Sequence, residues 1–183
     1  MSHQTPLFDY FQSIDGVKLT EYSGWTLPLS FGSGIVHEHR AVRTAAGVYD
    51  VSHMGRILVR GSGASEYVDR LITVRLPPAG SDACRYTFLC APDGGCIDDV
   101  LVYRLADDAV GLAVNAANRE AVLAWLESEN PYARRSGRVS SIDDVTFSTA
   151  QIAVQGPQSG EIVSRLTGGA STNLHFYLFS EIG

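Results

Sequence analysis

The stretch CRYTFLCAPDGGCIDDVLVYRL, residues 84–105, decides the fold. Apolar and aromatic residues fill both of its halves, and APDGG between them supplies the Pro, Asp and Gly that tight turns require. The stretch therefore predicts a β-hairpin whose strands flank residues 91–95. The second strand is unusual because it begins with two adjacent carboxylates, Asp98 and Asp99.

The segments around this hairpin extend it into a larger antiparallel sheet. Alternating polarity predicts strands, and apolar residues at helical spacing predict helices. The expected elements are, in order, a strand at 56–61, an amphipathic helix at 64–72, the hairpin, a strand at 107–115, a helix at 118–129 and a strand at 139–145. This order indicates an α+β fold with an antiparallel ferredoxin-like (split βαβ) sheet unit rather than a parallel doubly wound sheet.

The remaining segments carry weaker patterns. Residues 33–47 predict a helix that Ser33 caps, and residues 146–166 predict a strand, a turn and a helix. The apolar end HFYLFSEIG, residues 175–183, predicts a strand without a partner. We therefore expect residues 173–183 to be poorly ordered or paired with another chain.

Composition and charge exclude several classes of function. The 183 residues carry a formal net charge of -6, and Lys18 is the sole lysine, whereas nucleic-acid binding needs a clustered basic face. No apolar run approaches the roughly 18 residues that cross a membrane. The N-terminus MSHQTPLFDY also lacks the basic start and apolar core of a signal peptide. We expect a cytoplasmic protein that binds neither nucleic acid nor membrane.

The cysteines Cys84, Cys90 and Cys96 follow one another at intervals of six residues. Zinc sites use closely spaced pairs of cysteines, so this spacing predicts no metal site. Even spacing along a hairpin places some of these thiols on one face of the sheet, where they act as small buried hydrophobic side chains. We expect three reduced cysteines in the core.

The adjacent carboxylates must lie on opposite faces of their strand, because successive side chains of an extended chain alternate. Asp99 then lies with Leu101 and Tyr103. Asp98 lies on the other face with Val100. Both faces are apolar, which predicts a strand covered on both sides, where a carboxylate needs hydrogen bonds or a cationic ligand. Two interpretations stay open: a functional carboxylate, or a pair that caps the amides of the preceding turn.

The same residues belong to a longer pattern. It consists of TPLFDYF, SGWTLPLSFGSGIVHEHRAVRTAAGVYDVSHMGRILVRG, RYTFLCAPDGGCIDDVLVYRL, VNAANRE and IAVQGP, in this order. The pattern resembles the aminomethyltransferase (T-protein) family of the glycine cleavage system over the chain up to about residue 168. DVSHM together with GGxxDDxxVYR is specific. Related folate-dependent sarcosine and dimethylglycine oxidases have such a module too, and Asp-Asp after the double glycine favours the T-protein.

The resemblance implies two structural parts. Residues 1–54 and 146–183 are expected to form an outer folate-binding domain around a ferredoxin-like subdomain at residues 55–145. Family members continue with a GYTGExGxE-type motif, basic residues that meet the folate tail and a further β-rich domain. The outer domain is therefore expected to be incomplete, and the chain to be a fragment, a truncated gene product or half of a split protein.

The resemblance also implies a reaction and its residues. Family members pass the aminomethyl carbon held on the lipoyl arm of H-protein to tetrahydrofolate, a co-substrate. They release ammonia and form 5,10-methylenetetrahydrofolate without a metal. In the family pattern Asp99 is the catalytic carboxylate that faces the pterin. Met54 and Asn115 line the folate pocket, and Tyr86 is an aromatic side chain beside it. Asp98 is expected to cap the turn.

Elementary chemistry agrees with these roles but leaves alternatives. Breaking the carbon–sulfur bond develops positive charge, which a fixed carboxylate such as Asp99 stabilises. Met54 could instead fill the core, and either Asn115 or Asn118 could cap the following helix. Two other functions also stay open: a folate-binding module without transferase activity, and an interaction protein that recruits a partner through HFYLFS.

Overall fold

The computed structural model describes residues 2–136 and 138–182, except for the side chains of residues 129–136. The chain divides into two compact units. Unit 1 comprises Met1–His53, Phe147–Leu174 and Ser180–Gly183. Unit 2 comprises Met54–Thr146 and His175–Phe179. Each unit brings together segments that are distant in sequence.

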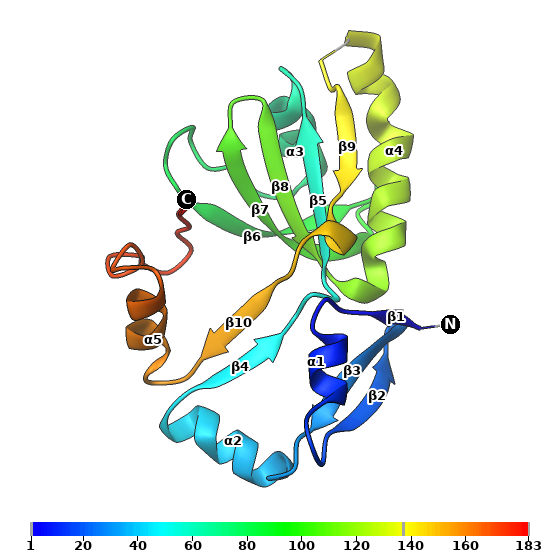
Figure 1. Ribbon diagram of the computed structural model, residues 1–183. Helices are drawn as coiled ribbons and strands as arrows, with labels where there is room; N and C mark the ends of the chain where they lie inside the picture. The colour runs from blue at the N-terminus through cyan, green and yellow to red at the C-terminus, as the bar shows by residue number, and fades with distance from the viewer. Residues whose placement is uncertain (1, 137, 183) are drawn as a thin grey trace. The chain divides into compact units, whose positions relative to one another are not determined.

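Unit 2 is built on a five-stranded sheet in which all neighbouring strands are antiparallel. Its strands, in spatial order, are β6 (Cys84–Cys90), β7 (Cys96–Ala106), β8 (Ala109–Val114), β5 (Gly55–Arg60) and β9 (Ser141–Asp144). Along the chain, α3 (Ala64–Leu71) follows β5, and the 3-10 helix η1 (Ala116–Asn118) and α4 (Arg119–Ser136) follow β8 (Figure 1). The predicted antiparallel sheet is confirmed, and the predicted hairpin of β6 and β7 lies at one edge of it.

The turn between β6 and β7 sets the register of that hairpin. The Gly94 N–H donates to the Ala91 carbonyl at 2.9 Å, and Gly94 has a φ of +87°, a conformation that favours glycine. The Gly95 N–H donates to Asp93 Oδ1 at 2.9 Å. A bulge between Leu89 and Cys90 then leaves Leu89 opposite Asp98 and Phe88 opposite Asp99.

The core lies on one face of this sheet. Branched side chains at alternate positions of β5, β7 and β8 pack against one side of α3 and of α4. The buried members include Ile57, Val59, Val68, Leu89, Val100, Val102, Val110, Leu112, Val114, Val122 and Leu126. Burial of one such side chain stabilises the fold by about 1.5–3 kcal/mol, so together they fix which face of β7 points inward.

Unit 1 consists of shorter strands and helices. Its first sheet has the order β1 (His3–Gln4), β3 (Trp25–Ser30) and β2 (Lys18–Tyr22), and its second pairs β4 (Gly47–Asp50) with β10 (Ile152–Gln155). The helices are α1 (Phe8–Gln12), α2 (Ile35–Thr44), α5 (Ser159–Leu166) and the 3-10 turn η2 (Thr146–Ser148), which begins in unit 2. Phe147 stacks on the buried Trp25, with ring centroids 5.4 Å apart and planes at 17°.

Two local expectations are wrong. Ser33 does not cap α2, because the residue before the helix is Gly34, which has a φ of 82° and no side chain to bond with. The chain end is not a strand without a partner. Cys84 donates its N–H to the Tyr177 carbonyl at 2.9 Å, and Phe179 donates to the Asp82 carbonyl at 2.8 Å. This segment therefore runs along the outer edge of the sheet beside β6.

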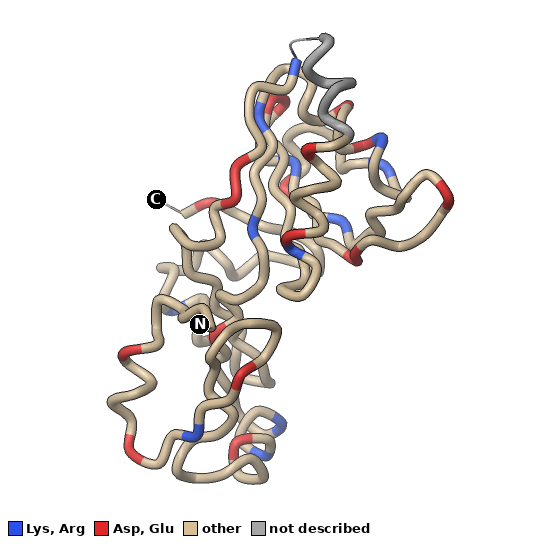
Figure 2. The backbone as a smooth tube through the Cα atoms, turned by 90° about the vertical axis from the view of Figure 1, so that its right-hand side faces the viewer, with Lys and Arg blue, Asp and Glu red and all other residues tan. Residues whose placement is uncertain are grey.

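Charged residues are dispersed along the chain. Figure 2 shows Asp and Glu positions and Lys and Arg positions scattered along the parts of the chain that are described. Among these same residues, no helix combines the length and the apolar composition needed to cross a membrane.

Candidate functional site

The two adjacent aspartates of β7 lie in different surroundings. Asp98 is 2% exposed and shares the core face with Val100, whereas Asp99 is exposed on the opposite face. That open face also carries Tyr86 and Phe88 of β6, which are 47% and 44% exposed. The expectation of a strand covered on both sides is therefore wrong at Asp99, because both helices of unit 2 pack on the Asp98 side. Farther along the face of Asp99, Tyr103 packs against Phe179.

Asp98 is a buried carboxylate whose oxygens are both bonded. Its Oδ2 accepts the Asn115 backbone N–H at 2.9 Å. Its Oδ1 accepts the side-chain amides of Asn115 and Asn118 at 2.9 and 2.6 Å. The expectation that Asp98 caps the preceding turn is wrong, since Asp93 bonds the turn amide instead. Asp98 holds the start of η1 against the start of β7.

Asn115 connects the buried aspartate with the exposed one. Its Nδ2 lies 2.9 Å from Asp98 Oδ1, 2.9 Å from Asp99 Oδ1 and 3.1 Å from the Asp99 carbonyl oxygen. Its side chain makes no capping hydrogen bond to η1, and Asn118 likewise donates to Asp98. Neither asparagine side chain therefore acts as the helix cap that the sequence allowed. Because Asp98 is fixed by the core, Asn115 transmits that fixed position to Asp99.

Asp99 has a second partner on the open face. The Tyr86 hydroxyl donates to Asp99 Oδ2 at 2.9 Å, so each carboxylate oxygen of Asp99 accepts one side-chain hydrogen bond. This hydrogen bond raises the pKa of Tyr86, and loss of solvation and the negative charge of Asp99 add to the effect. Phe88 lies opposite Asp99, with its ring centroid 5.8 Å from that of Tyr86 in an edge arrangement. A fixed carboxylate thus stands beside two exposed aromatic rings.

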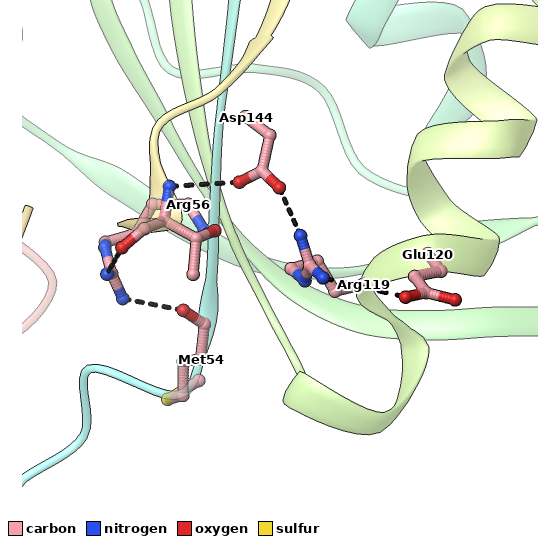
Figure 3. Close-up of polar contacts among 6 residues, drawn as sticks. Met54, Arg56, Arg119, Glu120 and Asp144 are labelled. Carbon is pink, nitrogen blue, oxygen red and sulfur yellow. Dashed lines mark hydrogen bonds and ion pairs between the residues drawn. The ribbon is translucent and has the colours of Figure 1, made fainter. Parts of the chain in front are cut away.

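Met54 lies at the same level of the sheet as this group. Gly55 pairs with Val114, so the next residues, Met54 and Asn115, come to one level at the ends of β5 and β8. The Arg56 guanidinium holds the backbone of Met54 through Nη1, which donates to the Met54 carbonyl at 2.6 Å (Figure 3). The structure therefore brings Asp99, Asn115 and Tyr86 together by direct hydrogen bonds, and strand register places the backbone of Met54 at the level of Asn115.

A neighbouring network fixes the ends of β5 and β9. Figure 3 shows Asp144 beside Arg119, whose guanidinium donates to Oδ2. The Thr146 N–H donates to Oδ1 at 3.0 Å. Burial opposes ionisation of Asp144, but the hydrogen bonds from Thr146 and the charge of Arg119 outweigh it and lower its pKa. No sequence motif indicated this network, since its members meet only when β9 pairs with β5.

The arrangement on the open face suits one kind of ligand. A carboxylate held by two hydrogen bonds keeps lone pairs free to accept N–H groups. The exposed rings of Tyr86 and Phe88 offer apolar surface beside it, on which a flat ring can lie. Asp99 and its neighbours can therefore bind a planar heteroaromatic ligand with N–H donors at its edge, or stabilise a positive charge near it.

Comparison with known proteins gives a consistent result. The family described as the GCVT N-terminal domain matches residues 8–183. The aminomethyltransferase of Thermoanaerobacter sp. (strain X514) is 38% identical over 178 residues, which are 97% of this chain and 46% of that protein. The aminomethyltransferase of Geobacillus kaustophilus (strain HTA426) is 41% identical over 170 residues, which are 91% of this chain and 44% of that protein.

The fold agrees with the sequence match. The crystal structure of glycine cleavage system aminomethyltransferase T from Bartonella henselae superposes with a TM-score of 0.85 at 29% identity, covering 97% of this chain and 47% of that chain. The chain thus spans about half the length of the relatives it matches. Its mixed α/β architecture with antiparallel sheets is that of the aminomethyltransferase structure, and the chain belongs to the GCVT N-terminal domain family.

Proposed function

We propose that the chain contributes to tetrahydrofolate-dependent aminomethyl transfer in the glycine cleavage system. In this reaction the aminomethyl carbon on the lipoyl arm of H-protein passes to tetrahydrofolate, giving 5,10-methylenetetrahydrofolate and ammonia, and no metal takes part. The observation that carries the proposal is the carboxylate of Asp99, exposed yet held at 2.9 Å by both Tyr86 and Asn115. It occurs in a chain whose curated relatives are named aminomethyltransferases.

Four residues have a role in this proposal. Asp99 is the catalytic residue, whose negative charge stabilises the positive charge that develops as the carbon–sulfur bond breaks. Asn115 and Tyr86 hold its two oxygens in a fixed orientation, which lowers the cost of reorganisation during the reaction. Met54 and Asn115 line the folate pocket, and Tyr86 lies beside the pterin. Tetrahydrofolate supplies the nitrogen nucleophiles, and its flat ring with edge donors fits the acceptor and aromatic groups present.

The proposal also assigns the architecture. Unit 2 corresponds to a ferredoxin-like subdomain, which is supported by the spatial order in which β9 and β8 flank β5 and by the helices that follow β5 and β8. Unit 1 corresponds to part of the outer folate-binding domain. Because the relatives are about twice as long, transfer activity is assigned to the chain together with the segment that those relatives carry in addition.

Titration of the purified chain with tetrahydrofolate under anaerobic conditions tests the binding part of this proposal. The two tryptophans provide a fluorescence signal. We expect saturable binding that weakens in Asp99→Asn and is unchanged in Asp107→Asn, a matched substitution at an exposed aspartate. Binding equal in all three proteins would remove Asp99 from the folate site, and absence of binding would favour an interaction protein.

A second experiment separates transfer from binding alone. The chain is combined with the C-terminal segment of the Geobacillus relative, with lipoylated H-protein and tetrahydrofolate as substrates. Formation of 5,10-methylenetetrahydrofolate is expected. Folate binding without product, in a combined protein that is folded, would instead support a folate-binding module that lacks transferase activity.

A further inference from the structure

Cys90 and Cys96 face each other across the hairpin of β6 and β7. Both are free thiols in the structure, as is Cys84. Only Cys84 is buried, whereas Cys90 is partly exposed and Cys96 is exposed. The expectation of three core cysteines is therefore wrong for Cys96, because the bulge beside the turn carries it to the surface. Two accessible thiols lie directly opposite each other.

The hairpin geometry suits a bond between these two thiols. The Ala91 N–H donates to the Gly95 carbonyl at 2.8 Å, which makes Ala91 and Gly95 a hydrogen-bonded position of the hairpin. The next pair outward, Cys90 and Cys96, then occupies a non-hydrogen-bonded position. Cα atoms at such positions are about 4.5 Å apart, and the side chains approach more closely than at other positions. Disulfides form at Cα separations of about 4.4–6.8 Å, a range that includes this typical spacing.

The pair lies on the open face of the sheet. Cys90 comes two residues after Phe88 and so shares its face, and Phe88 pairs with Asp99. Residues directly opposite each other across two strands also share a face, which places Cys96 with Cys90. Loss of solvation raises the pKa of the Cys96 thiol, and the negative charges of Cys90 and Asp99 contribute. The Cys96 thiol is therefore near Asp99 and less reactive at neutral pH than an isolated cysteine.

We propose that Cys90 and Cys96 form a reversible intramolecular disulfide by exchange with a low-molecular-weight disulfide. The exposed thiolate of Cys96 attacks glutathione disulfide, releases one glutathione and forms a mixed disulfide. The thiolate of Cys90 then attacks the Cys96 sulfur and releases the second glutathione. The protein loses two electrons and two protons, and glutathione disulfide becomes two glutathione thiols.

The bond locks the hairpin tip that leads into the candidate site. It closes a loop over residues 91–95 and covalently anchors β7 two residues before Asp98. Its formation depends on the hairpin alone and not on the proposed function. A covalent change at this place lies on the face of Asp99 and gives that face a means of redox control.

The test is thiol counting after equilibration of the native chain with glutathione disulfide. Remaining thiols are alkylated in denaturant, and the sites are mapped by digestion and mass spectrometry. We expect alkylation of Cys84 only, a peptide that links Cys90 to Cys96, and recovery of all three thiols with dithiothreitol. Cys90→Ser should retain one bound glutathione at Cys96, because the attacking thiol is missing. Cys84→Ala is the matched control, in which the same linked peptide should form.

Three results would overturn the proposal. They are retention of three free thiols, glutathione held at Cys96 of the unaltered chain without closure, and disulfides between molecules in place of the internal one. The raised pKa of Cys96 adds a kinetic check, since closure should accelerate as pH rises between about 7 and 9. Folate binding plays no part in these measurements, so they succeed or fail independently of the proposed function.

Discussion

Each face of the five-stranded sheet carries one of the two adjacent aspartates of β7, and their surroundings differ. On the core face, Asp98 is buried and accepts three hydrogen bonds from Asn115 and Asn118. On the open face, Asp99 is exposed and accepts hydrogen bonds from Tyr86 and from the same Asn115. A buried carboxylate with all its donors inside the protein is structural, whereas its exposed neighbour can meet a ligand. Asn115 joins the two, so the buried aspartate positions the exposed one.

The largest expected effect is on stability and falls on the core face. Asp98→Ala leaves the Asn115 N–H and the amides of Asn115 and Asn118 without their acceptor. Hydrogen bonds to a charged group contribute about 1.5–3 kcal/mol, and buried donors left unpaired add a desolvation cost. We expect the free energy of unfolding to fall by about 3 kcal/mol, measured by urea denaturation. Asp99→Ala, a change at an exposed position, should stay within about 0.5 kcal/mol of the unaltered chain. Equal losses of unfolding free energy at the two positions would show that the two aspartates do not differ in their contribution to stability.

The next effect is on catalysis and falls on the open face. Asp99→Asn keeps the shape of the side chain but removes its charge, and loss of one preorganised electrostatic contact costs on the order of a hundredfold in turnover. The measurement uses the chain completed by the C-terminal segment of a relative, with H-protein and tetrahydrofolate. Asp107→Asn is the control and should retain full turnover. A tenfold or smaller loss in Asp99→Asn would show that the carboxylate charge is not the main catalytic contribution.

A smaller effect on stability concerns Asp144, which bonds Arg119 and Thr146 where β5 and β9 meet. The pKa of Asp144 is lower in the folded protein than in the unfolded chain, so its stabilisation is present above the unfolded value and disappears as pH falls through the folded value. We expect Asp144→Asn to lower the free energy of unfolding by about 1 kcal/mol at neutral pH. The difference from the unaltered chain should shrink as pH falls below about 4. A difference that stays constant down to acid pH would contradict this account.

The smallest effect tests the contact between Tyr86 and Asp99. The pKa of Tyr86 is raised first by its hydrogen bond to Asp99, and then by lost solvation and by the charge of Asp99. Asp99→Asn should therefore lower the pKa of Tyr86 toward its ordinary value. Alkaline titration of 13C-labelled tyrosine rings by NMR measures this shift. An unchanged pKa would indicate that the hydroxyl does not bond Asp99 in solution.

Much of unit 2 could be predicted because its signals are local. The turn residues of APDGG predict the hairpin, and the alternation of β7 separates Asp98 from Asp99. The elements of unit 1 were harder to predict from the sequence, although one turn signal was present. Ser23 and Gly24 have φ values of 49° and 78° in the two-residue turn between β2 and β3, a combination that Ser-Gly between aromatic residues could have indicated.

The roles of the polar residues were the least predictable. Asn115 and Asn118 have the composition of helix caps, and only the pairing of β7 with β8 brings them to Asp98 instead. Arg119 and Asp144 are 25 positions apart in sequence and meet because β9 returns beside β5. Contacts of this kind depend on tertiary packing, which short-range sequence patterns do not record.

The sequence by itself determined the elements of the sheet, the separation of the two aspartates and the family resemblance, because turn chemistry, side-chain alternation and motif order are properties of neighbouring residues. Only the tertiary structure decided which aspartate is buried. Both faces of β7 are apolar in sequence, and the choice follows from the side on which α3 and α4 pack. That packing makes Asp98 the support and Asp99 the exposed group, because a helix layer can exclude water from only the face it covers.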